Sequence, residues 1–357
     1  MSVSAQPGHA AHHLVRAAVT APSIHNTQPW FFVGDEQDRA LELHADIGRR
    51  LPLADPDGRE LVISCGAALF NVRLAVRHLG FTPRVEYFPR PWDTSCLARV
   101  TWGSYSAPTG DEARLHAALA RRRTVRGPLR PDPLPPPLVD ALCGHARAEG
   151  ATLYAVQFRD DRQRLADVVR TAEAIHRTDL GHVVELARWT YSADQERLDG
   201  VPETACAYHP DYTPYAGRDY TGITRTIPAP PWSLASRTGL VVVLATPHDH
   251  RVNWLCAGQA LQRVLLCAAD QRVMAAFHTQ PLEVPRMRAQ IRRTITADAY
   301  PQMILRLGLA LRDGHLPDLP RRPPDQVLSL LGPVRRTGTG SRKCLGKEPS
   351  LLARQEP

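Results

Sequence analysis

A polar loop near the start of the chain carries the residues best suited to chemistry. Positions 21–30 read Ala-Pro-Ser-Ile-His-Asn-Thr-Gln-Pro-Trp, so Ser23, Asn26 and Gln28 place three hydrogen-bonding side chains in one short segment. Residues 10–20 have apolar side chains at helical spacing, and residues 28–33 read as a strand. Because loops between such elements present polar groups to ligands, we expect a binding loop. The alternative is a loop whose side chains satisfy only their own backbone.

Arginine clusters are the second candidate. Residues 121–126 read Arg-Arg-Arg-Thr-Val-Arg, and Arg321 and Arg322 form a basic pair late in the chain. A guanidinium offers paired donors that match phosphate oxygens, so clusters of this size suit one phosphate group better than a polyanion. The alternative for the first cluster is a solvated basic helix end that the helix dipole favours.

The opening loop resembles the APSxxNxQPW loop of the FMN-dependent nitroreductase family, and it is most similar to the Acg-type, single-chain branch. Residues 55–61, 65–69, 257–283 and 301–308 continue the resemblance, which covers positions 10–330 with a poor match in the middle. The resemblance implies an α+β, nitroreductase-like fold. Two tandem halves, each with a central sheet flanked by helices, would form a pseudo-dimer within one chain.

The resemblance also implies contacts to FMN. The family's basic-Ser/Thr-x-basic segment holds the phosphate, the ribityl chain and the pyrimidine edge of the ring. Here Arg122 and Thr124, with Arg123 beside them, would serve the phosphate and ribityl, and Arg126 would serve the N1/O2 edge. A cation at that edge stabilises the negative charge that builds on the ring upon reduction.

A floor and a wall complete the implied site. Pro281, Leu282 and Glu283 resemble the family's Pro-[Ile/Val/Leu]-Glu-Gly segment, whose backbone N–H faces flavin N5, although Val284 replaces the Gly. The wall and the last phosphate ligand would come from these residues: Pro22, Ser23, Ile24 and Asn26 of the opening loop, and either Arg321 or Arg322. Neither a catalytic side chain nor a metal is needed, because the cofactor carries the chemistry.

These parts belong to different halves of the chain. The loop lies in the first half, whereas the basic clamp at residues 122–126, the floor and the late basic pair lie in the second. In dimeric relatives the other subunit contributes the loop, so this chain would assemble one composite site. The reciprocal site lacks both parts, since no basic-Thr-basic segment precedes Leu14 and residues 150–153 read Gly-Ala-Thr-Leu in place of Pro-Ser-x-x-Asn. We expect one FMN per chain.

The chain divides into two halves and a tail. Residues 65–77 match residues 257–269 at an offset of 192 positions, in two helices with one buried face each. We expect strands at 28–33, 97–103, 151–158, 239–245 and 302–308, and an extended Pro-rich connection at 128–137. The halves are 1–115 and 116–335, followed by a disordered tail at 336–357. An aromatic, aperiodic stretch at 188–235 is expected to form a lid over the ligand.

Composition favours a globular protein with a large core, since 43% of the 357 residues are hydrophobic. No apolar run approaches the roughly 20 residues of a membrane helix, and the N-terminus lacks the layout of a secretion signal. We therefore expect a cytoplasmic protein without a membrane partner. The seven cysteines form no CxxC pair and read as buried thiols. The net charge of +8 is spread widely without a nucleic-acid-binding motif, so no nucleic-acid partner is expected.

The expected function is that of an FMN-dependent NAD(P)H oxidoreductase, with hydride passing from NAD(P)H to flavin N5 and then to a nitroaromatic, quinone or similar small molecule. The alternative is an FMN-sequestering protein with little turnover, which the long aromatic segment permits. A metal hydrolase using His44, Asp46, Asp55 and Asp57 is disfavoured, because no HxxxH or HxH spacing joins them and residues 55–58 read as a helix-capping turn. The single chain would mimic a dimer, and further oligomerisation stays open.

Overall fold

The computed structural model describes residues 9–35, 40–192, 194–206, 208–228, 238–311 and 319–331. The predicted disordered tail at 336–357 lies outside the described residues, as do positions 193, 207 and 229–237 of the predicted lid. Within the described parts, helices and mostly antiparallel sheets are combined, and the predicted α+β class is confirmed.

Two sheets form the framework. The first has the order β11 (Leu328–Leu331), β1 (Trp30–Asp35), β2 (Ala40–Ala45), β4 (Cys96–Tyr105) and β3 (Phe81–Tyr87). The second has the order β5 (Thr152–Ala155), β8 (Leu240–Thr246), β10 (Tyr300–Gly308) and β9 (Met274–Phe277). Each of the five predicted strands is found, with shifted ends. β11 pairs in parallel with β1, so the end of the described chain returns to the first sheet.

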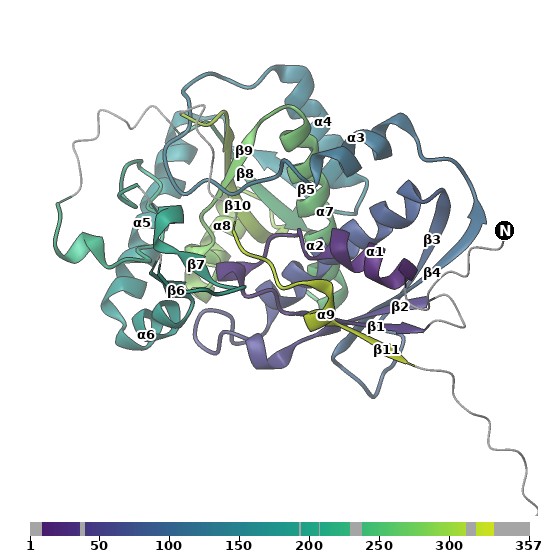
Figure 1. Ribbon diagram of the computed structural model, residues 1–357. Coiled ribbons are helices and arrows are strands. Elements are labelled where there is room, and N and C mark those ends of the chain that lie inside the picture. Colours follow the sequence, from purple (N-terminus) through teal and green to yellow (C-terminus); the bar gives the residue numbers. More distant parts are fainter. Residues whose placement is uncertain are drawn as a thin grey trace, which may run out of the picture.

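Two central helices, α2 (Arg59–His78) and α7 (Arg251–Asp270), lie between the sheets (Figure 1). Their buried faces contribute to two cores. One core joins α2 to α1 (His9–Ala18) and the first sheet, and the other joins α7 and α2 to the second sheet. The start of α2 follows from the predicted turn, because the carboxylate of Asp55 accepts the backbone N–H groups of Glu60 and Leu61. Those are donors that the first helical turn leaves without an internal partner.

The crossing of α2 and α7 requires two glycines. A Cβ on Gly66 would lie 2.3 Å from the carbonyl oxygen of Leu255, and a Cβ on Gly258 would lie 2.0 Å from that of Ile63. Gly258 stands 192 positions after Gly66, and Leu255 stands 192 positions after Ile63. The contact is therefore self-complementary, like the interface of a two-fold dimer. This geometry supports the predicted duplication, which stays a prediction.

By length and composition, α2 is the one described helix that could cross a membrane, with a mean hydropathy of 1.2. However, 83% of that apolar window is buried inside the molecule. Packing against α1, α7 and the first sheet accounts for its apolar character, since a helix that is apolar on most sides is typical of a protein core.

Smaller elements surround this framework. They are α3 (Gly110–Ala118), α4 (Pro136–Arg147), α5 (Arg159–Thr178), α6 (Leu180–Arg188), α8 (Pro285–Thr294), α9 (Pro324–Val327), β6 (Thr190–Tyr191) and β7 (Val201–Pro202). The predicted boundary at 115/116 falls inside α3, and the division into two halves stays a prediction.

Candidate functional site

A large cavity lies where the opening loop meets the second sheet and the aromatic segment. Its empty space, including the open mouth, measures about 1160 Å³. The predicted site residues that line it are Pro22, Ser23, Ile24, Asn26, Thr124, Arg126 and Arg321. Parts of the chain nearly 300 positions apart therefore meet around one space.

The opening loop has an unusual backbone. Within and after its 3-10 helix, Ile24–Asn26, three residues adopt positive φ angles: His25 at 44°, Asn26 at 56° and Gln28 at 49°. This backbone conformation is strained in residues other than glycine, so contacts with the surrounding structure must stabilise it. Ser23 helps, since its Oγ accepts the backbone N–H of Gln28 at 2.9 Å.

Side chains of the same loop tie three distant segments together. The amide nitrogen of Asn26 donates to the carbonyl oxygens of Gly200 at 2.9 Å and Pro320 at 3.1 Å, and its Oδ1 accepts from Arg321 at 2.7 Å. Gln28 donates to Leu198 O at 2.7 Å. The loop thus joins the aromatic segment and the C-terminal segment at the edge of the cavity.

The basic segment runs beside the second sheet. The N–H of Val125 donates to Ala275 O of β9 at 2.8 Å, which brings Thr124 and Arg126 to the cavity wall. Arg122 does not line the cavity but is buried, and its Nη2 donates to Thr20 O at 3.3 Å.

Arg122 is a buried cation with spare donors. Its Nε and Nη1 have no hydrogen-bond partner among the residues that the structure describes. Burial, together with the charges of Arg321 and Arg123, lowers the pKa of Arg122 to about 9. A buried guanidinium that faces other guanidiniums is costly unless an anion compensates it. The arrangement therefore fits a phosphate group.

The two late arginines take different roles. Arg321 lines the cavity, whereas the backbone N–H of Arg322 donates to Gln28 Oε1 at 2.8 Å. The Nη1 of Arg322 lies 3.8 Å from Asp46. Of the pair, Arg321 is therefore the one placed to reach a ligand in the cavity.

The predicted floor lies beside the cavity. Pro281 and Leu282 belong to the 3-10 helix Gln280–Leu282, where the N–H of Leu282 bonds to Thr279 O at 2.8 Å. Neither these residues nor Glu283 line the main cavity; Leu282 and Glu283 line a separate one. Glu283 forms an ion pair with Arg218, a residue that does line the main cavity.

Sequence reasoning missed several lining residues. Among them are Tyr208, Arg218 and Tyr220 of the aromatic segment, whose lack of periodicity hides which side chains face inward. Arg306 was also missed, although an arginine within the apolar run of β10 is a visible signal. Its Nε donates to His278 Nε2 at 2.8 Å, and burial lowers the pKa of Arg306 to about 10.

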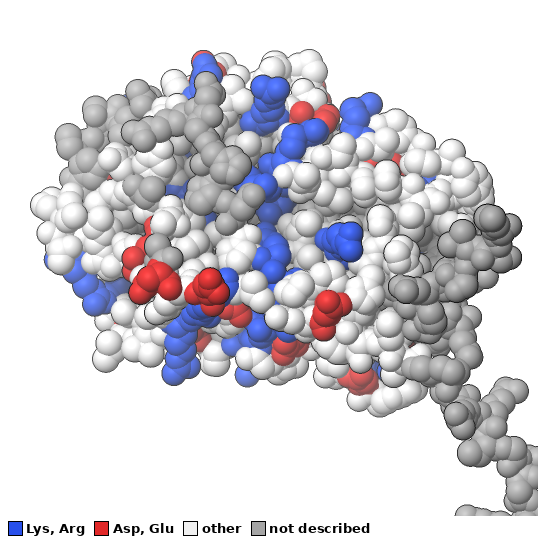
Figure 2. All heavy atoms as spheres, viewed as in Figure 1, with Lys and Arg blue, Asp and Glu red and all other residues white. Residues whose placement is uncertain are grey.

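The cavity is electropositive. Arg126, Arg218, Arg306 and Arg321 line it, and the acidic residue among the described lining residues is Glu60. Burial and the nearby Glu283 raise the pKa of Glu60 to about 8. Lys and Arg side chains also gather along the middle of the face shown in Figure 2. Such a field favours anionic ligands.

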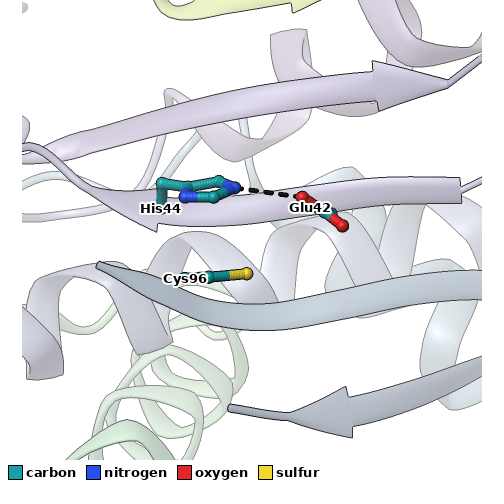
Figure 3. A group of neighbouring side chains, drawn as sticks. All are labelled: Glu42, His44 and Cys96. Carbon is teal, nitrogen blue, oxygen red and sulfur yellow. Dashed lines mark hydrogen bonds and ion pairs between the residues drawn. The ribbon is translucent and has the colours of Figure 1, made fainter. Parts of the chain in front are cut away.

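A possible metal-binding group lies elsewhere. Glu42, His44 and Cys96 gather on β2 and β4 of the first sheet (Figure 3), with ligand atoms within 4.8 Å of one another. Glu42 is already paired with Arg90 at 2.8 Å and with His44 at 3.1 Å. Burial, with the charge of Glu42, raises the pKa of the Cys96 thiol to about 11. We interpret the group as a buried ion-pair network.

Comparison with known proteins gives close relatives in sequence. The chain matches no family model. It is 34% identical over 313 residues to "Putative NAD(P)H nitroreductase Rv3131" of Mycobacterium tuberculosis, covering 87% of this chain and 88% of that protein. It is 31% identical over 316 residues to "Putative NAD(P)H nitroreductase acg" of the same species, covering 88% and 93%.

Solved structures are similar only at a distance. A nitroreductase with bound FMN from Bacteroides fragilis has 12% identity and a TM-score of 0.36, covering 64% of this chain and 98% of that one. The FMN- and NADPH-dependent nitroreductase NfnB from Sphigopyxis has 15% identity and a TM-score of 0.39, covering 61% and 99%.

Proposed function

This chain belongs to the NAD(P)H nitroreductase family that includes Acg, and on that basis we propose that it is an FMN-dependent NAD(P)H oxidoreductase with its cofactor in the main cavity. The family resemblance inferred from the sequence is confirmed. When bound, FMN takes a hydride from NAD(P)H and supplies two electrons to an acceptor such as a nitroaromatic or a quinone.

The buried guanidinium of Arg122, with that of Arg321 nearby, is the observation that carries this proposal. Arg122 has two donors without partners, and its pKa is lowered first by burial and then by Arg321, which lines the cavity. A phosphate would neutralise both cations and accept the free donors. Thr124 lies on the same segment and would bond the phosphate or the ribityl chain.

The remaining lining would orient a flat ring. Arg126 would hold the pyrimidine edge, and Arg218 and Arg306 would add positive charge to the cavity. Pro22 and Ile24 would pack against one side of the ring. Tyr208, Tyr215 and Tyr220 would cover the opposite side and limit the access of water. These residues bind, orient and shield, and none acts as a nucleophile.

Anaerobic spectroscopy tests this function. Protein reconstituted with FMN and freed of excess cofactor should show a flavin absorption band, and NADPH or NADH should bleach it within seconds. Addition of a quinone should then restore the band. A chain that retains no flavin, or a bound flavin that neither pyridine nucleotide reduces, would contradict the proposal.

A second function, FMN sequestration, is favoured by the ion pairs that attach the aromatic segment to the rest of the molecule. Arg218 forms a buried ion pair with Glu283, and Arg177 binds Asp211 through two hydrogen bonds of 2.9 and 2.8 Å. A segment held at both places would open rarely. Persistent yellow colour in the presence of NADPH would favour this alternative. The cytoplasmic location stays a prediction.

A further inference from the structure

Three residues line two cavities at once. His25, Arg218 and Tyr220 face the main cavity and also a second one of about 870 Å³ including its mouth. The second cavity is bounded mainly by polar residues of α5, α6 and the segment 218–225, among them His176 and His182. A space of this size that opens at a mouth and carries several polar side chains admits water. The three shared residues therefore form a partition between a water-accessible space and the proposed flavin site.

Two members of the partition are hydrogen-bonded to each other. The Nδ1 of His25 lies 3.0 Å from the hydroxyl oxygen of Tyr220, and the two rings meet edge to face at 5.6 Å. The Nε2 of His25 has no hydrogen bond to any residue that the structure describes, which leaves it available to a ligand. His25 is held at a φ of 44°, a strained conformation of the kind that recurs at functional sites.

The surroundings keep both groups in their neutral forms. Burial first, and then the charges of Arg218, Arg126 and His176, lower the pKa of His25 well below its usual value, so the ring is neutral. Burial raises the pKa of Tyr220, so its hydroxyl keeps its proton. The guanidinium of Arg126 lies 5.5 Å from the Tyr220 ring. A relay through this contact requires Tyr220 O–H to donate to Nδ1, with the ring proton of His25 on Nε2.

We propose that His25 and Tyr220 form a proton relay that carries solvent protons from the second cavity to the electron acceptor in the main cavity. This inference rests on the proposed function. It gives the chain a proton donor that the family resemblance did not supply.

With a quinone as the acceptor, the protons and electrons of the relay are balanced. Reduction to the hydroquinone uses two electrons and two protons; a hydride brings both electrons and one proton, and the second proton must come from solvent. The His25 Nε2–H bond breaks as the acceptor O–H bond forms, and Nδ1 takes the proton of Tyr220. Water in the second cavity returns a proton to the Tyr220 oxygen. The His25 ring then returns from the Nδ1–H tautomer to the Nε2–H tautomer, which restores the starting state.

Reoxidation kinetics test the relay. In FMN-loaded protein reduced with dithionite, Tyr220→Phe should slow reoxidation by a quinone at least about tenfold, within the range of general-acid effects. Reoxidation by ferricyanide, which takes electrons without protons, should change less than about twofold. The wild-type quinone reaction should also show a solvent deuterium isotope effect that the variant loses. Chemical reduction keeps this test independent of whether NAD(P)H is a substrate.

A matched variant separates the relay from general damage. Tyr212→Phe removes a hydroxyl from the same segment, and Tyr212 packs on Tyr208 without lining either cavity. It should leave both reoxidation rates unchanged. Equal slowing with quinone and ferricyanide in Tyr220→Phe, or no slowing with quinone, would overturn the relay. Failure of NADPH to reduce the wild type would instead count against the proposed function.

The hydrogen bond has a readout that needs no cofactor. In protein labelled with ¹⁵N at histidine, NMR should show His25 as the neutral Nε2–H tautomer with Nδ1 accepting a hydrogen bond. Tyr220→Phe should shift the Nδ1 resonance, whereas Tyr212→Phe should not. A wild-type His25 protonated on Nδ1 would overturn the proposed direction of the relay.

Discussion

At the scale of single residues, the main feature is positive charge held out of water. Arg122 and Arg306 are buried, and burial is the first cause that lowers the pKa of each. Arg306 has neutral partners, His278 and the carbonyl oxygen of Gly127. Uncompensated buried cations reduce the stability of an empty protein, so their presence is best explained by an anion that binds there.

Replacing Arg122 by Met should separate binding from folding. The FMN dissociation constant should rise about 10- to 100-fold, because charge-assisted hydrogen bonds worth roughly 1.5–3 kcal/mol are lost. The free energy of unfolding of the apoprotein should stay the same or rise by about 1 kcal/mol, since a buried cation is removed. Fluorescence titration and urea unfolding measure the two quantities.

Arg121→Met is the control for that variant, because Arg121 is exposed and paired with Asp270 at 2.8 Å. It should leave FMN affinity within about twofold. Equal losses of affinity in both variants, or an unchanged affinity in Arg122→Met, would remove Arg122 from the phosphate site.

Buried neutral histidines predict a loss of stability in acid. His278 donates from Nδ1 to Ala216 O and accepts at Nε2 from Arg306, so its neutral form is required. Burial and Arg306 lower its pKa well below 6.5. Above the pKa of His278 in the unfolded chain, this histidine is neutral in both the folded and the unfolded state. As the pH falls below about 6.5, His278 gains a proton in the unfolded chain but stays neutral in the folded protein. The free energy of unfolding should therefore fall by up to about 1.4 kcal/mol per pH unit.

In the variant His278→Gln, the free energy of unfolding should depend less steeply on pH between pH 6 and pH 5. The difference should correspond to about one proton fewer taken up on unfolding. Urea unfolding at several pH values measures the slope. An identical slope in the variant and the wild type would show that His278 is not held neutral.

A site residue could be predicted from the sequence where it belongs to a recognisable motif, and not where it lies in a segment without a pattern. Thr124, Arg126 and the opening loop occupy a matched motif, and the structure brings them to one cavity. Tyr220 and Arg218 sit in a segment without periodicity, so no pattern shows which side chains face inward. The predicted floor at Pro281–Glu283 lies beside the cavity, and the backbone N–H groups of Leu282 and Glu283 are bonded within the local 3-10 turn.

At the scale of elements, the crossing of α2 and α7 determines how the two sheets are placed. Matching apolar patterns predicted both helices, but the pattern could not show that they touch at Gly66 and Gly258. Strand positions were predicted because alternation and apolar runs are local signals. The return of β11 to β1 has no such signal, since it depends on contacts across the whole chain.

Alanine substitutions test the crossing. Gly258→Ala would place a Cβ against the Ile63 backbone, so the helices must separate, and the free energy of unfolding should fall by about 1–3 kcal/mol. Gly144→Ala in α4 meets nothing within 4 Å and should be neutral or stabilising by up to about 1 kcal/mol. Similar melting temperatures for the two variants would contradict the described contact.

At the scale of the whole molecule, the main cavity joins segments from both predicted halves of the chain. The opening loop comes from the α1–β1 connection, the basic segment lies beside β9, and Arg321 comes from the segment before α9. Because only one combination of loop and clamp is present in the sequence, the molecule should hold a single cofactor. If the predicted duplication is correct, the self-complementary packing of α2 on α7 corresponds to the interface between two subunits.

Stoichiometry of FMN binding tests this account most directly. Apoprotein of known concentration, with its mass in solution measured by light scattering, should bind one FMN per chain in a fluorescence-quenching titration, whatever its oligomeric state. Arg122→Met should weaken that single binding event without changing its stoichiometry. Two FMN per chain, or no binding at all, would contradict a composite site formed by the two halves of one chain.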